Sequence, residues 1–168
     1  GRRLFAAHCA SCHRYNGHDG RGYPVDEPQS AADLAGFAST EWITELLNYD
    51  HYVSEKYFGG TKFKDGTMAK KVLAKYSQEE NKLLPDIARL LADGAQLPYE
   101  ESLDEDIREE LLSLYYNDDL KFEDGRACIE CHDIDSEDEG SAPDLTGYGS
   151  REWLIAFIEN PEDKRFYG

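Results

Sequence analysis

Apolar residues recur at helical spacing in four stretches of the chain, and two of these stretches match each other. The matching pair places apolar side chains at the same relative positions: Trp42, Ile43, Leu46 and Leu47 in the first, and Trp153, Leu154, Phe157 and Ile158 in the second. This spacing lines one face of a helix. Ser39 and Ser150 stand just before the two stretches and are predicted to be N-caps.

Two further helices are predicted between this pair. The first follows Ser77-Gln78-Glu79-Glu80, which has the pattern of a capping box, and it carries Leu83, Leu84, Ile87, Leu90 and Leu91. Pro85 predicts a kink or a late start in this helix, and Gly94 predicts its end. The second follows a similar capping box, Ser102-Leu103-Asp104-Glu105, and carries Ile107, Leu111, Leu112, Leu114 and Tyr115.

Composition and charge exclude several classes of protein. The 168 residues carry 18 Lys and Arg against 35 Asp and Glu, a formal net charge of −17, of which −14 falls in residues 99–141. A nucleic-acid binder is therefore excluded, because neutralising phosphates requires a surplus of basic residues. The longest apolar runs, such as residues 154–158, are too short for a membrane span of about 20 residues. No signal peptide is visible, so we expect a targeting segment to have been removed or to lie upstream.

The four cysteines fall into two copies of the pattern C-x-x-C-H, which is the attachment site of c-type haem. The copies are Cys9-Ala10-Ser11-Cys12-His13 and Cys128-Ile129-Glu130-Cys131-His132. In such a motif two thiols reach the two vinyl groups of one porphyrin, and the following histidine lies beneath the iron. The sequence therefore predicts two covalent haems, with His13 and His132 as their proximal iron ligands.

Three other interpretations of the cysteines are weaker. A single zinc site would have to join pairs separated by 115 residues, whereas zinc ribbons use about 15 to 20. Thioredoxin-like chemistry requires a βαβ context, which the flanking sequence lacks. Disulfides within each C-x-x-C would be strained and would leave both histidines unexplained.

A repeated block follows each of these motifs. Residues 32–43 and 143–154 share the order D-L-x-G, S and E-W, and residues 56–59 parallel residues 164–168. The order C-x-x-C-H, glycine-rich loop, D-L-x-G, S-x-x-W helix and G-T-M resembles class I cytochromes c, and the whole chain resembles a dihaem member. The resemblance implies an all-α fold with two tandem cytochrome c-like domains, the second truncated at its C-terminus. We expect domain 1 at 1–97, an acidic linker and helix at 98–116, and domain 2 at 117–168.

The resemblance also implies roles for individual residues. Met68 stands where the family places the distal sulfur ligand, on what is predicted to be a polar, glycine-bearing loop, and His8, His18 and His51 are weaker alternatives that we interpret as surface or loop residues. A backbone carbonyl near Pro143 is expected to accept the second ring N–H of His132, and Ala32 is the aligned residue in domain 1. Four side chains are expected near the rings: Leu34 and Leu145 in contact with them, and Trp42 and Trp153 either as donors to a haem propionate or as core aromatics.

The distal ligand of the second haem is missing from the sequence, since neither Met nor His follows His132. Two interpretations stay open. In the favoured one, the natural chain continues and supplies the methionine. In the other, the site is five-coordinate or takes a weak ligand such as Lys164, and an open iron would bind small molecules.

We therefore expect a periplasmic or otherwise extracytoplasmic electron carrier rather than an enzyme, relaying single electrons between respiratory proteins. The residues after the Trp153 helix more weakly resemble dihaem subunits associated with cytochrome bc-type quinol oxidoreductases; such a complex or a terminal oxidase is the expected partner. Five lysines around Met68 predict a basic docking surface, and the acidic segment predicts another for a basic partner, although both are also explained as solvated surface: Lys62, Lys64, Lys70, Lys71 and Lys75. The alternatives are a dihaem peroxidase-like enzyme with an open second haem and a gas or redox sensor.

Overall fold

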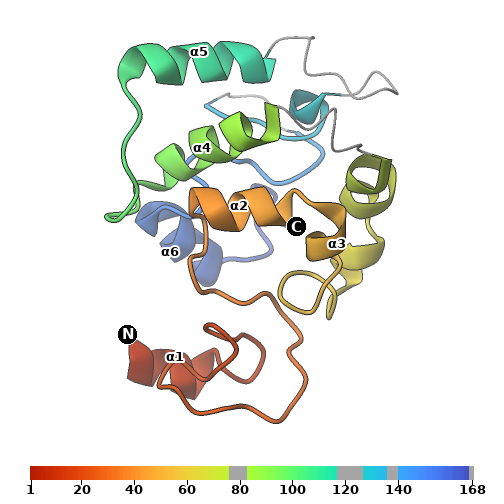
Figure 1. Ribbon diagram of the computed structural model, residues 1–168, viewed down its shortest axis with the longest axis vertical. Helices are drawn as coiled ribbons and strands as arrows, with labels where there is room; N and C mark the ends of the chain where they lie inside the picture. Colours follow the sequence, from red (N-terminus) through yellow and green to blue (C-terminus); the bar gives the residue numbers. More distant parts are fainter. Residues whose placement is uncertain (76–82, 117–126, 136–139, 167–168) are drawn as a thin grey trace. The chain divides into compact units, whose positions relative to one another are not determined.

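The computed structural model describes residues 1–75, 83–116, 127–135 and 140–166. Over these ranges the chain is helical and contains no strand, only isolated bridges that join Tyr15 to His18 and His18 to Pro24. It divides into two compact units, Gly1–Phe37 with Thr44–Tyr76, and Ala38–Ile43 with Ser77–Gly168 (Figure 1). Among the described residues no helix is long and apolar enough to cross a membrane. The predicted all-α class is thus confirmed for this part of the chain.

The first unit is built from short helical segments. Helix α1 (Arg2–His8) precedes the first cysteine, and α3 (Tyr49–Tyr52) is capped by the Asn48 side chain. Three consecutive turns follow: η1 (Lys62–Asp65), the π-helical η2 (Met68–Val72) and η3 (Leu73–Lys75). Tyr52, Ala69 and Leu73 form a buried apolar cluster between these segments. This cluster joins α3 to the turns that carry Met68.

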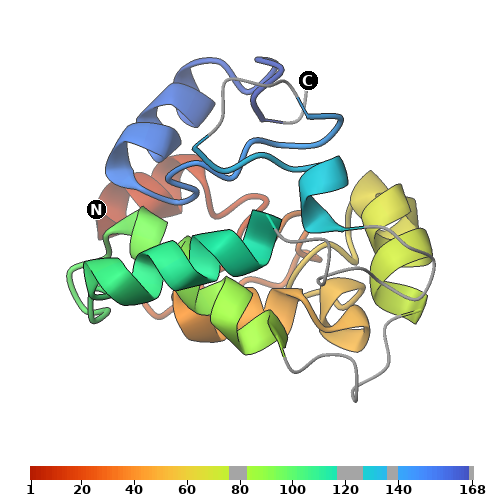
Figure 2. The same cartoon turned by 90° about the horizontal axis from the view of Figure 1, so that it is seen from above.

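The second unit contains the longer helices. Helices α4 (Leu84–Ala95) and α5 (Glu105–Tyr116) pack against each other, and Figure 2 shows them side by side. The turn η6 (Cys128–Glu130) contains the third cysteine, and α6 (Arg151–Glu159) follows the second repeated block. Helix α2 (Thr40–Leu46) contributes residues to both units.

The matched helices form largely as predicted. The Ser39 and Ser150 hydroxyls each accept a hydrogen bond of 3.1 Å, from the N–H groups of Trp42 and Trp153, so both N-caps are confirmed. Both tryptophans are buried. Ile158 is the exception, because it is 75% exposed. The buried stripe of α6 runs from Trp153 to Phe157, whose rings stack, and Ile158 lies beyond its edge.

The ends of α4 and α5 differ in part from the prediction. Helix α4 starts late, with Pro85 in its first turn, which is one of the two predicted outcomes. Gly94 does not end it, since the helix continues to Ala95 and Gln96 takes the left-handed conformation instead, with φ 51°. A Cβ atom at Gly94 would lie 3.7 Å from Gly147 Cα, so this glycine lies at a close approach of two backbone segments.

Helix α5 begins at Glu105 rather than directly after Ser102. The N–H of Leu103 is drawn to the carboxylate of Asp93, to which it donates at 2.9 Å. The N–H of Arg108 closes the first turn on the carbonyl of Asp104. The other predicted capping box, residues 77–80, includes positions outside the described residues.

The two compact units do not coincide with the predicted domains. Helix α4 falls within predicted domain 1, but it groups with the second unit. The units are groups of residues that contact one another, whereas the predicted domains were drawn around the two C-x-x-C-H motifs. The boundaries at 1–97, 98–116 and 117–168 therefore stay a prediction.

We expect Asp93 to be the main polar link between α4 and α5. Its side chain accepts from Leu103 N–H, lies 3.5 Å from Arg108 Nε and belongs to a residue only 8% exposed. Asp93→Ala should lower the free energy of unfolding by about 1 to 2 kcal/mol, because it removes the acceptor of the part-buried Leu103 N–H and one of the two carboxylates that pair with Arg108. Denaturant unfolding of the holoprotein measures this loss.

The matched control is Asp86→Ala on the same helix. Asp86 is exposed and pairs with Arg89 at 3.6 Å on the surface, so its loss should change the unfolding free energy by no more than about 0.5 kcal/mol. Equal effects from the two variants would contradict the role given to Asp93.

Candidate functional site

The two C-x-x-C-H motifs adopt the same backbone turn. In the first motif, the N–H groups of Cys12 and His13 both donate to the Cys9 carbonyl, at 3.1 and 2.9 Å. The second motif repeats both hydrogen bonds at the same lengths. All four cysteines carry free thiols. Each turn thus brings two unpaired sulfurs and one imidazole together over five residues.

Each motif histidine is oriented by a backbone carbonyl. His13 Nδ1 lies 2.7 Å from the Ala32 oxygen, and His132 Nδ1 lies 2.7 Å from the Pro143 oxygen. These are the carbonyls that the aligned repeats predict. Because a carbonyl only accepts, Nδ1 must carry the proton, and Nε2 keeps its lone pair. That tautomer is the one in which Nε2 binds a metal.

The donor set of each motif therefore fits a covalently attached haem. Two free thiols are available for thioether bonds, and a neutral imidazole presents Nε2 for the iron. Burial lowers the pKa of His132, which keeps its ring neutral against the opposing effects of the Pro143 carbonyl and the Asp133 charge. The residues thus supply what such a group requires, in both motifs.

The thiols of the two motifs differ in acidity. Burial raises the pKa of Cys128 to about 11. Hydrogen bonds from Ser30 and Ser11 lower the pKa of Cys12, and the charge of Arg14 acts in the same direction. The two shifts concern different positions, the second cysteine of the first motif and the first cysteine of the second motif.

The repeated block forms the same backbone hydrogen bond to the residue after each histidine, and we call this shared backbone arrangement the frame. Leu34 N–H donates to the Arg14 carbonyl, and Leu145 N–H donates to the Asp133 carbonyl, both at 2.8 Å. Gly36 and Gly147 both take positive φ, 70° and 59°, which glycine adopts without strain. Leu34 and Leu145 are themselves half-buried. Their predicted contact with the porphyrin rings stays a prediction.

Both tryptophans are buried, and Trp153 packs against other aromatic rings. The Trp153 ring packs on Tyr148, Phe157 and Phe166, with centroids 4.9, 5.2 and 5.0 Å away. Trp42 is 3% exposed. These contacts are those of core aromatics. The alternative role as propionate donors stays a prediction for both residues.

Met68 lies on a helical turn and not on the predicted loop. It begins η2 and packs, half-buried, against the cluster of Tyr52, Ala69 and Leu73. The loop prediction was wrong because Ala69 and Leu73 bury one side of residues 68–75, which favours helical turns over an open loop. The position agrees with an apolar site for the thioether, and the iron-ligand role stays a prediction.

The other histidines occupy surface or loop positions, as interpreted from the sequence. His8 and His51 are exposed. The Nδ1 atom of His18 accepts from Gly20 N–H at 2.9 Å, so this ring is engaged in its own loop. Lys164, the weak ligand considered for the second haem, is exposed.

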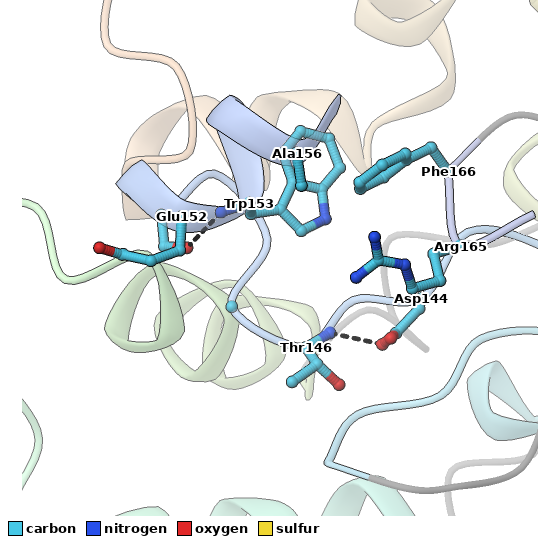
Figure 3. Close-up of a pocket in the computed structure, with 9 residues that line it drawn as sticks. Asp144, Thr146, Glu152, Trp153, Ala156, Arg165 and Phe166 are labelled. Carbon is cyan, nitrogen blue, oxygen red and sulfur yellow. Dashed lines mark hydrogen bonds between the residues drawn. The ribbon is translucent and has the colours of Figure 1, made fainter. Parts of the chain in front are cut away.

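The second unit contains a pocket of about 340 Å³ that the sequence did not predict. Its lining includes the Trp153 indole, the Phe166 ring and the Arg165 guanidinium, which Figure 3 shows around the opening. Ala156 also lines it, and in the aligned repeat Glu45 holds this position. The Glu45 carboxylate accepts from Lys56 Nζ and Tyr57 OH, each at 2.5 Å.

The two repeats differ at two of the positions that line this pocket. Alanine replaces glutamate at position 156, and Phe166 has no hydroxyl to place where Tyr57 donates. The signal in the sequence was the small residue at a position that the first repeat fills with a charged side chain.

Three further residues near the motifs were also missed. Arg14 Nη1 donates to the carbonyl of His13 at 2.9 Å, and Tyr115 OH donates to the carbonyl of His132 at 3.0 Å. Asp133 is buried beside His132. Arg14 and Asp133 directly follow the histidines, which was a visible signal. Tyr115 lies on α5, 17 residues before His132, and nothing local in the sequence indicates the contact.

Comparison with known proteins gives one match. The family model described as cytochrome c matches residues 1–86, which is just over half of the chain. These residues contain the first C-x-x-C-H motif, the first repeated block and Met68. No curated protein matches the chain, and no solved structure matches it.

Proposed function

This chain belongs to the cytochrome c family, and from that premise we propose that it relays single electrons through two covalently bound c-type haems. Membership supports a class I c-type cytochrome whose activity is haem-based electron transfer. When bound, such a haem supplies a one-electron couple at its iron. The second haem, the partners and the location belong to the proposal.

The observation that carries the second haem is the histidine hydrogen bond. Both motifs place Nδ1 at 2.7 Å from a backbone carbonyl of the following block, although 19 residues separate the partners in the first and 11 in the second. Loops of different length thus arrive at one geometry. A shared geometry with free thiols on both sides supports a shared cofactor.

In this proposal each residue has a simple task. The cysteine thiols of each motif form thioether bonds, and the histidine Nε2 atom binds the iron. The carbonyls of Ala32 and Pro143 hold the two rings in place and increase the basicity of Nε2. Met68 supplies the sixth ligand of the first haem, which raises its reduction potential.

Removing one pair of cysteines should remove one haem. Cys128→Ala with Cys131→Ala should lower the haem content from two to one per chain, because the remaining histidine cannot attach the group covalently. Cys9→Ala with Cys12→Ala is the matched variant and should give the same ratio. Intact mass and the haem-to-protein ratio measure both. A wild-type protein with the mass of a single haem would contradict the proposed dihaem state.

Replacing Met68 should change the ligation of the first haem while preserving the fold. Leucine keeps the apolar contacts with Tyr52 and Leu73, since Leu and Met have similar volumes, but it lacks the sulfur. Met68→Leu should therefore lower the reduction potential of the first haem and convert its low-spin signal to a high-spin one in electron paramagnetic resonance. His18→Ala is the control and should change neither. An unchanged spectrum in Met68→Leu would exclude this ligand.

The residues between His132 and Gly168 include neither Met nor His, and a second candidate function is therefore kept. With its sixth position open, the second iron would bind small ligands, as in a dihaem peroxidase-like enzyme. The same spectra of the wild-type protein distinguish the two functions. Two low-spin haems support electron transfer, and a high-spin second haem that binds carbon monoxide supports the enzyme.

We propose redox proteins outside the cytoplasm as partners, with a cytochrome bc-type complex or a terminal oxidase among them. Attachment of c-type haem takes place there in bacteria, as the family implies. The lysines around Met68 are exposed, and Lys70 pairs with the equally exposed Asp65 at 2.8 Å. This basic surface suits an acidic partner, and the acidic segment 99–141 suits a basic one.

If these surfaces guide encounters, electron-transfer rates should depend on ionic strength. Oxidation of the reduced protein by a small anionic metal complex should slow as salt is added, because salt screens exposed charges. Lys64→Glu with Lys71→Glu should reduce the rate at low salt and leave it unchanged near 1 M salt. A cationic complex of similar potential is the control and should show the opposite salt trend. Rates independent of ionic strength would exclude the guiding role.

A further inference from the structure

The residue that follows each motif histidine has opposite charge in the two repeats, although the backbone is the same. Arg14 and Asp133 both follow the iron-binding histidine, and their carbonyls accept from Leu34 and Leu145 at the same 2.8 Å. Both residues are buried, 4% and 8% exposed. The two repeats thus place a cation and a carboxylate at equivalent buried positions.

The cation of Arg14 is held against the first motif. Its Nη1 atom donates to the carbonyls of Ala10 and His13, at 2.7 and 2.9 Å, and its Nη2 atom donates to the carbonyl of Glu27. Three backbone carbonyls solvate the charge without neutralising it. These hydrogen bonds fix the guanidinium directly beside the motif, in contact with the carbonyl of His13 itself.

In the second motif a neutral group takes the place of the guanidinium. The His132 carbonyl accepts from the hydroxyl of Tyr115, which is fully buried. Asp133 directly follows His132 and is itself buried, so its carboxylate lies close to the motif. The hydrogen bond is thus kept in both repeats, while the charge beside it changes sign.

The difference extends to the neighbouring positions of the frame. Asn16 and Asp135 are equivalent and share the same left-handed φ of 54°, and Asp33 is equivalent to Asp144. Burial raises the pKa of Tyr116, and three carboxylates raise it further: Asp133, Asp135 and Asp144. Formal charges at the three equivalent positions therefore add to 0 in the first repeat and to −3 in the second.

One cation partly offsets this in the second repeat. Arg108 lies 2.7 Å from Asp135 and 3.5 Å from Asp93. It is therefore shared between two carboxylates, and Asp133 is not among its ion-pair partners.

Resting on the proposed pair of haems, we infer that the buried Arg14 raises the reduction potential of the haem bound by His13, in addition to the effect of its proposed Met68 ligand, and that the buried Asp133 lowers the potential of the haem bound by His132. Oxidation adds one positive charge at the iron, so a buried cation opposes it and a buried carboxylate favours it. One electron passes from the reduced second iron to the oxidised first iron, with no proton transferred. At equilibrium, a single electron shared by the two haems resides mainly on the first.

The test is a spectroelectrochemical titration of the holoprotein, which should show two one-electron steps. Arg14→Gln should shift the upper step downward, and Asp133→Asn should shift the lower step upward. Each shift should be about tenfold in the one-electron equilibrium constant, which is about 59 mV. Each variant should leave the other step in place.

Charge-retaining variants separate electrostatics from folding. Arg14→Lys and Asp133→Glu should keep both steps close to the wild type, and haem content should be unchanged throughout. If Arg14→Gln does not fold, Asp133→Asn and the salt dependence of the gap between the two steps still test the inference. The gap between the steps should persist near 1 M salt, because buried charges are screened far less than exposed ones.

Three results would overturn the inference: an upper step that responds to Asp133→Asn, steps that do not move in either neutralised variant, or a gap that closes at high salt. If intact mass shows only one haem per chain, the proposed dihaem function fails, and the inference fails with it. Two haems whose potentials ignore these residues show failure of the inference alone.

Discussion

The hydrogen bond from the histidine ring to a backbone carbonyl is the constraint on which both sites depend. It fixes the proton on Nδ1 and leaves Nε2 as the free donor atom. Its two partners come from different segments, so the chain must return to the motif to form it. The return is secured by further bonds close by, since Leu34 and Leu145 donate to the residues that follow the histidines. The same group of hydrogen bonds therefore orients the histidine ring and closes the loop that leads back to it.

The two repeats close this loop in different ways. In the first, the Asp33 carboxylate accepts from three backbone N–H groups, those of Asn16, Gly17 and Ala35. These bonds fix the longer loop between His13 and Ala32 at its two ends. In the second, the loop is shorter, and α5 adds support from outside through Tyr115 and Tyr116, whose hydroxyls donate to the carbonyls of His132 and Ile134. The helix predicted to be a linker thus braces the second motif.

Local signals in the sequence predicted local structure well. The serine caps and the start of α4 depend on neighbours a few residues away, and the pattern of side chains contains that information. The end of α4 depends instead on Gln96, which takes the left-handed conformation and donates from its side chain to the Asp93 carbonyl. The start of α5 depends on Asp93, ten residues before Leu103. Periodicity does not encode such contacts. The same reason hid the pocket beside Trp153, because its shape depends on what Ala156 leaves unfilled.

The candidate site shows the same division between local and distant information. The thiols and the imidazoles were found because one short motif contains them, and the Ala32 and Pro143 carbonyls because the repeats align. Arg14 was visible beside His13, but its burial against three carbonyls was not. The backbone turn is the same in both repeats, although the side chains on it differ. Arg14 stands where the second repeat has Asp133, and Asn16 where it has Asp135, so the two repeats surround the motif histidine with different charges.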